Sequence, residues 1–170
     1  MLLGAILERV TGRTFSAYCG EKIFRAAGMD ATTPLPSPGS GTAIAYTGAF
    51  GTSFKPLPPY YGTPAGGEYS TVGDLFAFAR AIQSNRLLDQ TSTRLLTTGK
   101  INTGTGSYSL GFHVASRNGV PSYGDEGSAP GVSGEFTIYP RHGYITVVLC
   151  NRGYPIELNA GAYIGARLPA

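Results

Sequence analysis

The feature that most constrains the fold is a pair of strand-like runs separated by a four-residue link. The runs are Gly134–Tyr139 and Tyr144–Cys150, and the link reads Pro140-Arg141-His142-Gly143. Ile, Val, Thr, Tyr and Phe favour strands, whereas Pro and Gly favour turns. The pattern therefore predicts an antiparallel hairpin on which the other elements pack.

A glycine-rich segment comes directly before the hairpin. Gly124–Gly131 reads GDEGSAPG, which predicts a turn. A turn held by a rigid hairpin can direct backbone N–H groups toward a ligand, so Gly127 and Ser128 are candidate oxyanion donors. Asp125 and Glu126 are either a solvated pair or, if one of them is removed from water, a general acid or base.

The rest of the chain alternates between helical periodicity and loop composition. Helices are predicted over residues 1–10, 15–27, 72–84, 90–97 and 156–168, with a further strand over 108–115. Thr14 and Thr71 stand at helix cap positions, and Asp74 completes a capping-box pattern with Thr71. The segment 30–64 is rich in proline and glycine and predicts a long loop with one extended piece near 42–46.

This order of elements predicts an α+β fold, with an antiparallel sheet of three strands and flanking helices. We expect one domain over 1–170, in which 1–100 is the helical and loop part. Residues 101–170 then supply the strands and the closing helix. The first residues read as a helix already under way, so we expect the protein to continue upstream.

Composition excludes several classes of function. The net charge of +3 is mild and the basic residues are scattered, which argues against a nucleic-acid partner. No apolar run reaches the roughly 18 residues that a membrane span needs. Cys19 and Cys150 do not fit a metal-ligand spacing, and neither His113 nor His142 has suitable neighbours, so we expect neither a metal nor a cofactor.

The sequence contains no complete nucleophile motif. No serine stands in a G-x-S-x-G elbow or begins an S-x-x-K box, and Gly131–Gly134 has the wrong spacing. His113 in its strand is expected to be structural, and His142 to be an exposed turn residue. Tyr69 either lines a ligand cleft or packs with its hydroxyl at the surface.

Six strings, in order along the chain, resemble segments of one enzyme family. They are LLGAILERVTG (2–12), KIFRAAGM (22–29), AGGEYSTVGDL (65–75), YSLGF (108–112), YGDEGSAPG (123–131) and VVLCN (147–151). They are similar, respectively, to the helix after a Tyr-x-Asn motif, to "IF-x-PLGM", "AGGLYSTA-x-DL", "YGLGF" and "FGH-x-GG-x-PG", and to "VVLSN". This is the serine beta-lactamase-like family of penicillin-binding proteins, class C beta-lactamases, D-alanyl-D-alanine peptidases and related esterases.

The resemblance implies an acyl-serine mechanism acting on small esters, beta-lactams or peptides. Its serine and lysine come from S-x-x-K and its tyrosine from Tyr-x-Asn, and neither motif occurs in this chain. The third motif aligns the family's His or Lys with Asp125, its glycine with Gly127, and its oxyanion N–H with Ser128. A carboxylate at Asp125 would repel an anionic substrate, which favours an esterase-like or degenerate member.

We therefore expect the C-terminal part of a beta-lactamase/transpeptidase-like fold, inactive alone because it lacks the nucleophile. Asp125, Glu126 and Tyr69 are the expected substrate-binding residues. The alternative is a non-catalytic binding or complementation module, whose partner is a missing N-terminal half or a second copy. A purely structural scaffold would have no pocket beside Gly127. The sequence leaves the compartment open.

Overall fold

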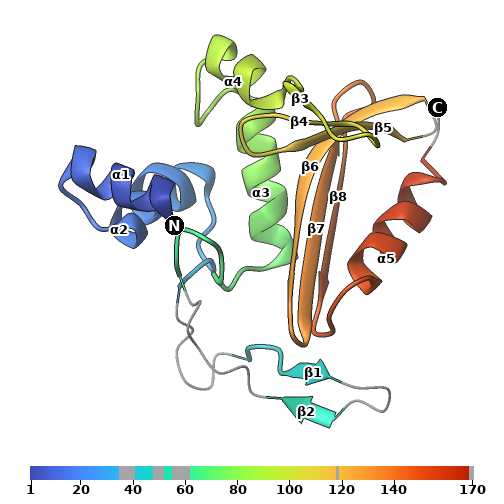
Figure 1. The fold of residues 1–170 in the computed structure, drawn as a ribbon, viewed down its shortest axis with the longest axis horizontal. Helices are drawn as coiled ribbons and strands as arrows, with labels where there is room; N and C mark the ends of the chain where they lie inside the picture. Colours follow the sequence, from blue (N-terminus) through green and yellow to red (C-terminus); the bar gives the residue numbers. More distant parts are fainter. Residues whose placement is uncertain (35–40, 48–51, 55–61, 118, 169–170) are drawn as a thin grey trace.

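A computed structural model describes residues 1–34, 41–47, 52–54, 62–117 and 119–168 (Figure 1). The predicted α+β fold is confirmed. The helices are α1 (Leu2–Thr11), α2 (Phe15–Cys19), which continues as a π-helical segment (Gly20–Arg25), α3 (Val72–Gln83), α4 (Gln90–Thr97) and α5 (Ile156–Gly165). The strands are β1 (Ala45–Thr47), β2 (Thr52–Phe54), β3 (Ile101–Asn102), β4 (Ser107–Tyr108), β5 (His113–Arg117), β6 (Val120–Ala129), β7 (Val132–Tyr139) and β8 (Tyr144–Cys150).

The main sheet is antiparallel throughout and has the order β3-β4-β5-β6-β7-β8. The three longest strands, β6 to β8, lie between α3 on one face and α5 on the other (Figure 1). β1 and β2 form a separate two-stranded ribbon near the β6–β7 turn. The predicted hairpin is present as β7 and β8, and the predicted extended piece near 42–46 falls partly on β1.

The turn predicted over Gly124–Gly131 is wrong, because β6 continues to Ala129 and the chain turns only at Pro130 and Gly131. Gly124 explains the error. A Cβ there would lie 2.0 Å from the Phe136 carbonyl oxygen, so this glycine permits close approach of two strand backbones. The strand predicted over 108–115 is divided between β4 and β5, and β3 and β6 are additional strands. The described sheet therefore has six strands instead of three.

The core lies between the sheet and α3. One cluster joins residues of α3, the β4–β5 connection and strands β6 and β7: Ala79, Ile82, Phe112, Tyr123 and Ile138. The Phe136 ring meets the rings of Phe78 and Phe112 edge-on, with centroids 5.8 Å apart in both pairs. A second cluster, made of Ala27, Met29 and Ala81, lies between α3 and the chain after the π-helical segment. Phe78 and Leu87 pack against both clusters.

The predicted caps are present, but Asp74 has a different role. Thr14 accepts a hydrogen bond from the Ala17 N–H, and Thr71 accepts one from the Asp74 N–H. The buried Asp74 carboxylate accepts hydrogen bonds from the Ala31 N–H (2.9 Å) and the Thr32 hydroxyl (2.6 Å). The Asp74 carboxylate therefore links α3 to the segment that contains Ala31 and Thr32, instead of completing a capping box.

The apolar stripe of α1 is exposed. Leu3, Ile6 and Val10 have 81%, 50% and 79% of their surface accessible. Leu95 of α4 is also half exposed, whereas its neighbour Leu96 packs on the core. Much of the predicted loop, including Tyr60 and Tyr61, lies outside the described residues.

Candidate functional site

The candidate site is the part of β6 that extends beyond β5. The two strands pair only as far as His113 opposite Gly124, whereas β7 pairs with β6 to its end. On the side away from β7, the segment Asp125–Ala129 therefore has no neighbouring strand in the described part of the chain. Backbone N–H groups that point to that side are available to a ligand, because successive groups along a strand alternate in direction.

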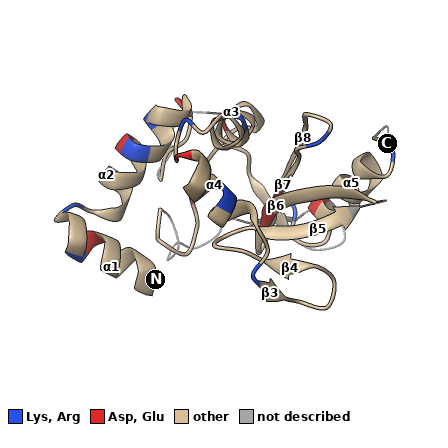
Figure 2. Cartoon of the chain, turned by 90° about the horizontal axis from the view of Figure 1, so that it is seen from above, with Lys and Arg blue, Asp and Glu red and all other residues tan. Residues whose placement is uncertain are grey.

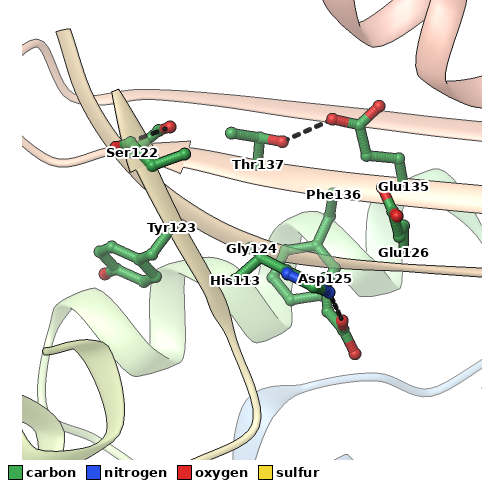
Figure 3. A pocket seen from close by; sticks show the side chains of 10 residues that line it. His113, Ser122, Tyr123, Gly124, Asp125, Glu126, Glu135, Phe136 and Thr137 are labelled. Atoms are coloured by element: carbon green, nitrogen blue, oxygen red, sulfur yellow. Dashed lines mark hydrogen bonds and ion pairs between the residues drawn. The ribbon is translucent and has the colours of Figure 1, made fainter. Parts of the chain in front are cut away.

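Asp125 and His113 approach each other at the start of this free segment (Figure 3). The Nε2 atom of His113 lies 3.9 Å from Asp125 Oδ1, and the two side chains are 52% and 42% exposed. The ring of Tyr108 packs edge-on against His113 with a centroid distance of 4.8 Å. The sequence predicts a structural role for His113. The structure places its imidazole beside Asp125 of β6, the strand that contains the GDEGSAPG segment.

The surroundings of Asp125 oppose the ionisation of its carboxyl. Burial raises the pKa of the Asp125 carboxyl above its ordinary value of 3.8, while a backbone hydrogen bond from Glu126 and the charge of His113 partly oppose this rise. Burial, and to a smaller extent Asp125, also raises the pKa of Tyr108. A carboxyl shifted this way beside an imidazole can take part in proton transfer.

Glu126 points to the other face of the sheet from Asp125. Side chains alternate along a strand, so Asp125 lies on the α3 side of the sheet and Glu126 on the α5 side, beside Glu135 (Figure 3). Glu135 is buried and accepts a hydrogen bond from the Thr137 hydroxyl at 2.8 Å. The two neighbouring acids of the sequence therefore point to opposite faces of the sheet, although both border the small depression described below.

Gly127 and Ser128 lie further along the free segment and are exposed. They pair with Gly134 and Ser133 of β7. A Cβ built on Gly127 would have no heavy atom within 4 Å, so this position opens to solvent. A ligand could reach the backbone here.

Tyr69 is held elsewhere. It forms an isolated antiparallel bridge with Thr33, in which its N–H donates to the Thr33 carbonyl at 2.8 Å and its carbonyl accepts from the Thr33 N–H at 3.0 Å. It does not line the depression next to Asp125. The structure thus brings Asp125, Gly127 and Ser128 onto one strand edge but does not join Tyr69 to them.

The depression at this site is small. It has a volume of about 50 Å³, and its lining includes His113, Ser122, Asp125, Glu126 and Glu135. Ligand sites are usually several hundred Å³ in volume, so a substrate would need a second wall. Among the described residues, no three His, Cys, Asp or Glu side chains gather as metal ligands, and Cys19 and Cys150 are free thiols. No helix in the described ranges has the length and apolarity to cross a membrane. Lys, Arg, Asp and Glu are sparse along the described chain (Figure 2).

The raised pKa of Asp125 gives a testable pH dependence. Because the folded pKa exceeds 3.8, ionisation of Asp125 opposes folding at neutral pH, and this penalty disappears as the pH falls below 3.8. We expect Asp125→Asn to stabilise the protein at pH 7, by less than about 1 kcal/mol because the side chain is partly solvated, and to have no effect at pH 3. Urea unfolding at the two pH values measures this. The exposed Glu126→Gln is the control, and a destabilised Asp125→Asn at pH 7 would contradict the prediction.

Comparison with known proteins agrees with this fold. The family model described as Beta-lactamase matches residues 1–169, so the chain belongs to the beta-lactamase family. It is 27% identical to penicillin-binding protein 4 of Amycolatopsis lactamdurans, with 89% of this chain and 45% of that protein covered.

Solved structures resemble the chain over almost its full length. A penicillin-binding protein from Bacillus halodurans matches with a TM-score of 0.85 and 28% identity, covering 98% of this chain and 54% of that one. A class C beta-lactamase from Rhodobacter sphaeroides matches with a TM-score of 0.79 and 20% identity, covering 97% and 57%. The chain thus has a beta-lactamase-family serine hydrolase fold and spans about half the length of these relatives.

Proposed function

We propose that this chain forms one wall of an acyl-serine hydrolase site and has no hydrolytic activity by itself. The observation that carries the proposal is the segment Asp125–Ala129, which has no neighbouring strand on one side among the described residues and aligns with the family's third motif. The facing wall, with the S-x-x-K and Tyr-x-Asn motifs, would come from a separate or upstream N-terminal half.

In this proposal the chain stabilises charge but does not attack the substrate. A serine on the facing wall would add to the ester or amide carbonyl while the lysine or tyrosine of that wall takes its hydroxyl proton, and negative charge would develop on the carbonyl oxygen. The Ser128 backbone N–H would donate to that oxygen. Gly127, without a side chain, leaves the approach to the strand open.

The pair Asp125 and His113 favours neutral substrates over anionic ones. The family's cation is replaced by a carboxyl, and His113 of β5 brings an imidazole to within 3.9 Å of it. A neutral ester avoids the repulsion that Asp125 would exert on a substrate carboxylate. We therefore expect the protein, once both walls of the site are present, to act on neutral esters. His113 is then a candidate for proton transfer.

The alternative is a non-catalytic module that pairs with another chain. It is supported by the exposed Leu3, Ile6 and Val10 of α1, and by the outer edge of β8, which has no neighbouring strand in the described part. Both features suit a protein partner: the missing half or a second copy.

The first test uses the purified chain alone. We expect no serine to be acylated by a fluorescent penicillin and no burst with a nitrophenyl ester, and stoichiometric labelling would overturn the proposal. The sequence encoded upstream separates the two alternatives, because an in-frame S-x-x-K and Tyr-x-Asn would favour the enzyme.

If such a longer chain exists, two substitutions at one position test the role of the backbone. Ser128→Pro removes the N–H and should lower kcat about 100-fold or more. Ser128→Ala keeps the N–H and should retain most of the activity. Equal losses in the two variants would rule out the backbone role.

A further inference from the structure

A second and larger hollow lies at the end of the sheet where β7 begins and β8 ends. It has a volume of about 290 Å³ and is lined by Tyr46 and Thr47 of β1, by Gly131 of the β6–β7 turn, and by Arg152, Gly153, Tyr154 and Ile156 after β8. We call it the Arg152 groove. It shares no lining residue with the depression at Asp125.

Hydrogen bonds and close packing hold the walls of the Arg152 groove in place. The Tyr46 N–H donates to the Asn151 carbonyl at 2.9 Å, and the Asn151 side-chain amide donates to the Ile44 carbonyl at 3.0 Å. Gly131 has a φ of 81°, and a Cβ there would lie 2.9 Å from the Ala45 Cβ. Glycine at this turn therefore lets β1 lie directly against the sheet end and form one wall of the groove.

The opposite wall is fixed as well. The buried Ser133 hydroxyl donates to the Arg152 carbonyl at 2.7 Å, which sets the backbone from which the guanidinium projects. Within the described residues, none of the ion pairs involves Arg152.

The electrostatics of the groove favour an anion. Arg152 is the one charged residue among those that line it. α5 begins at Ile156 without a side-chain cap, so its first N–H groups add partial positive charge on the same side. Glu157, the acid of that first turn, is buried and does not line the groove.

We propose that the Arg152 groove binds a small ligand that carries a carboxylate next to a planar ring. The guanidinium presents two parallel N–H groups that match the two oxygens of a carboxylate. Tyr46 and Tyr154 supply aromatic faces for the ring. The groove adjoins the far end of the proposed hydrolase wall but shares no lining residue with the depression at Asp125, and its binding can be tested on the chain as it stands.

The test is a titration of the ¹⁵N-labelled chain with benzoate, followed by NMR. We expect millimolar binding that shifts the Gly131 and Gly153 amide signals. Arg152→Gln keeps the carbonyl that Ser133 binds and should weaken benzoate binding about tenfold, as expected for the loss of a charged hydrogen-bond pair. The matched control is Arg141→Gln, in the β7–β8 turn at the other end of the sheet, which should bind like the wild type.

Two further ligands define the chemistry. Neutral benzyl alcohol should bind much more weakly than benzoate, and equal binding would overturn the proposal. Phenylphosphonate tests a phosphoryl oxyanion, and if it binds more tightly than benzoate, the carboxylate assignment is wrong. Absence of shifts at Gly131 and Gly153, or unchanged binding by a folded Arg152→Gln variant, would also overturn the proposal.

Discussion

Gly124→Ala should destabilise the protein by about 3 kcal/mol. The added Cβ would lie 2.0 Å from the Phe136 carbonyl oxygen and 2.9 Å from the Thr137 Cα. Both are backbone atoms of β7, so the clash can be relieved only by moving one strand relative to the other. Urea unfolding followed by circular dichroism gives the change in the free energy of unfolding.

Gly127→Ala is the matched control for this prediction. It lies three residues further along β6, and the same methyl group would meet no heavy atom within 4 Å. We expect a change of less than about 0.5 kcal/mol, as for an ordinary surface substitution. Similar losses in the two variants would show that β6 and β7 are not in the close contact described here.

Ile138→Ala should cost a similar or larger amount, about 2–5 kcal/mol. Ile138 is completely buried between the sheet and α3, among Phe112, Tyr123 and Ile82. Removing three carbons leaves a cavity that close-packed aromatic neighbours cannot easily fill. The midpoint of thermal unfolding and the urea midpoint should both fall.

The control for the cavity is Ile101→Ala. Ile101 lies on the short strand β3 and is 67% exposed, so the same atoms are removed from a solvated position. Its unfolding free energy should stay within about 0.5 kcal/mol of the wild type. A loss at Ile101 equal to that at Ile138 would contradict the position of the core.

The sequence predicted the elements whose signals are local. The helix boundaries and the caps at Thr14 and Thr71 agree with the structure to within a few residues, because periodicity and cap chemistry act over one or two turns. The hairpin of β7 and β8 was predictable for the same reason, since its strands are separated by four residues.

Strand β6 was missed because glycine has two uses. Gly124 and Gly127 suggest a turn. Gly124 is needed instead because the backbone of β7 approaches it closely, and β7 lies outside the local sequence around Gly124. The approach of His113 to Asp125 depends on the register between β5 and β6, which no local pattern encodes. The Arg152 groove likewise joins segments that are distant in sequence, so only the structure places Tyr46 beside Arg152.

Phe78 and Leu87, which pack against both apolar clusters, bear on how the chain unfolds. Because the clusters share these two side chains, loosening the segment that follows the π-helix also removes contacts from the sheet. We therefore expect the helical part and the strand part to lose structure in a single cooperative transition, with one midpoint for every spectroscopic probe. The division near residue 100 would then mark a change of secondary structure within one folding unit.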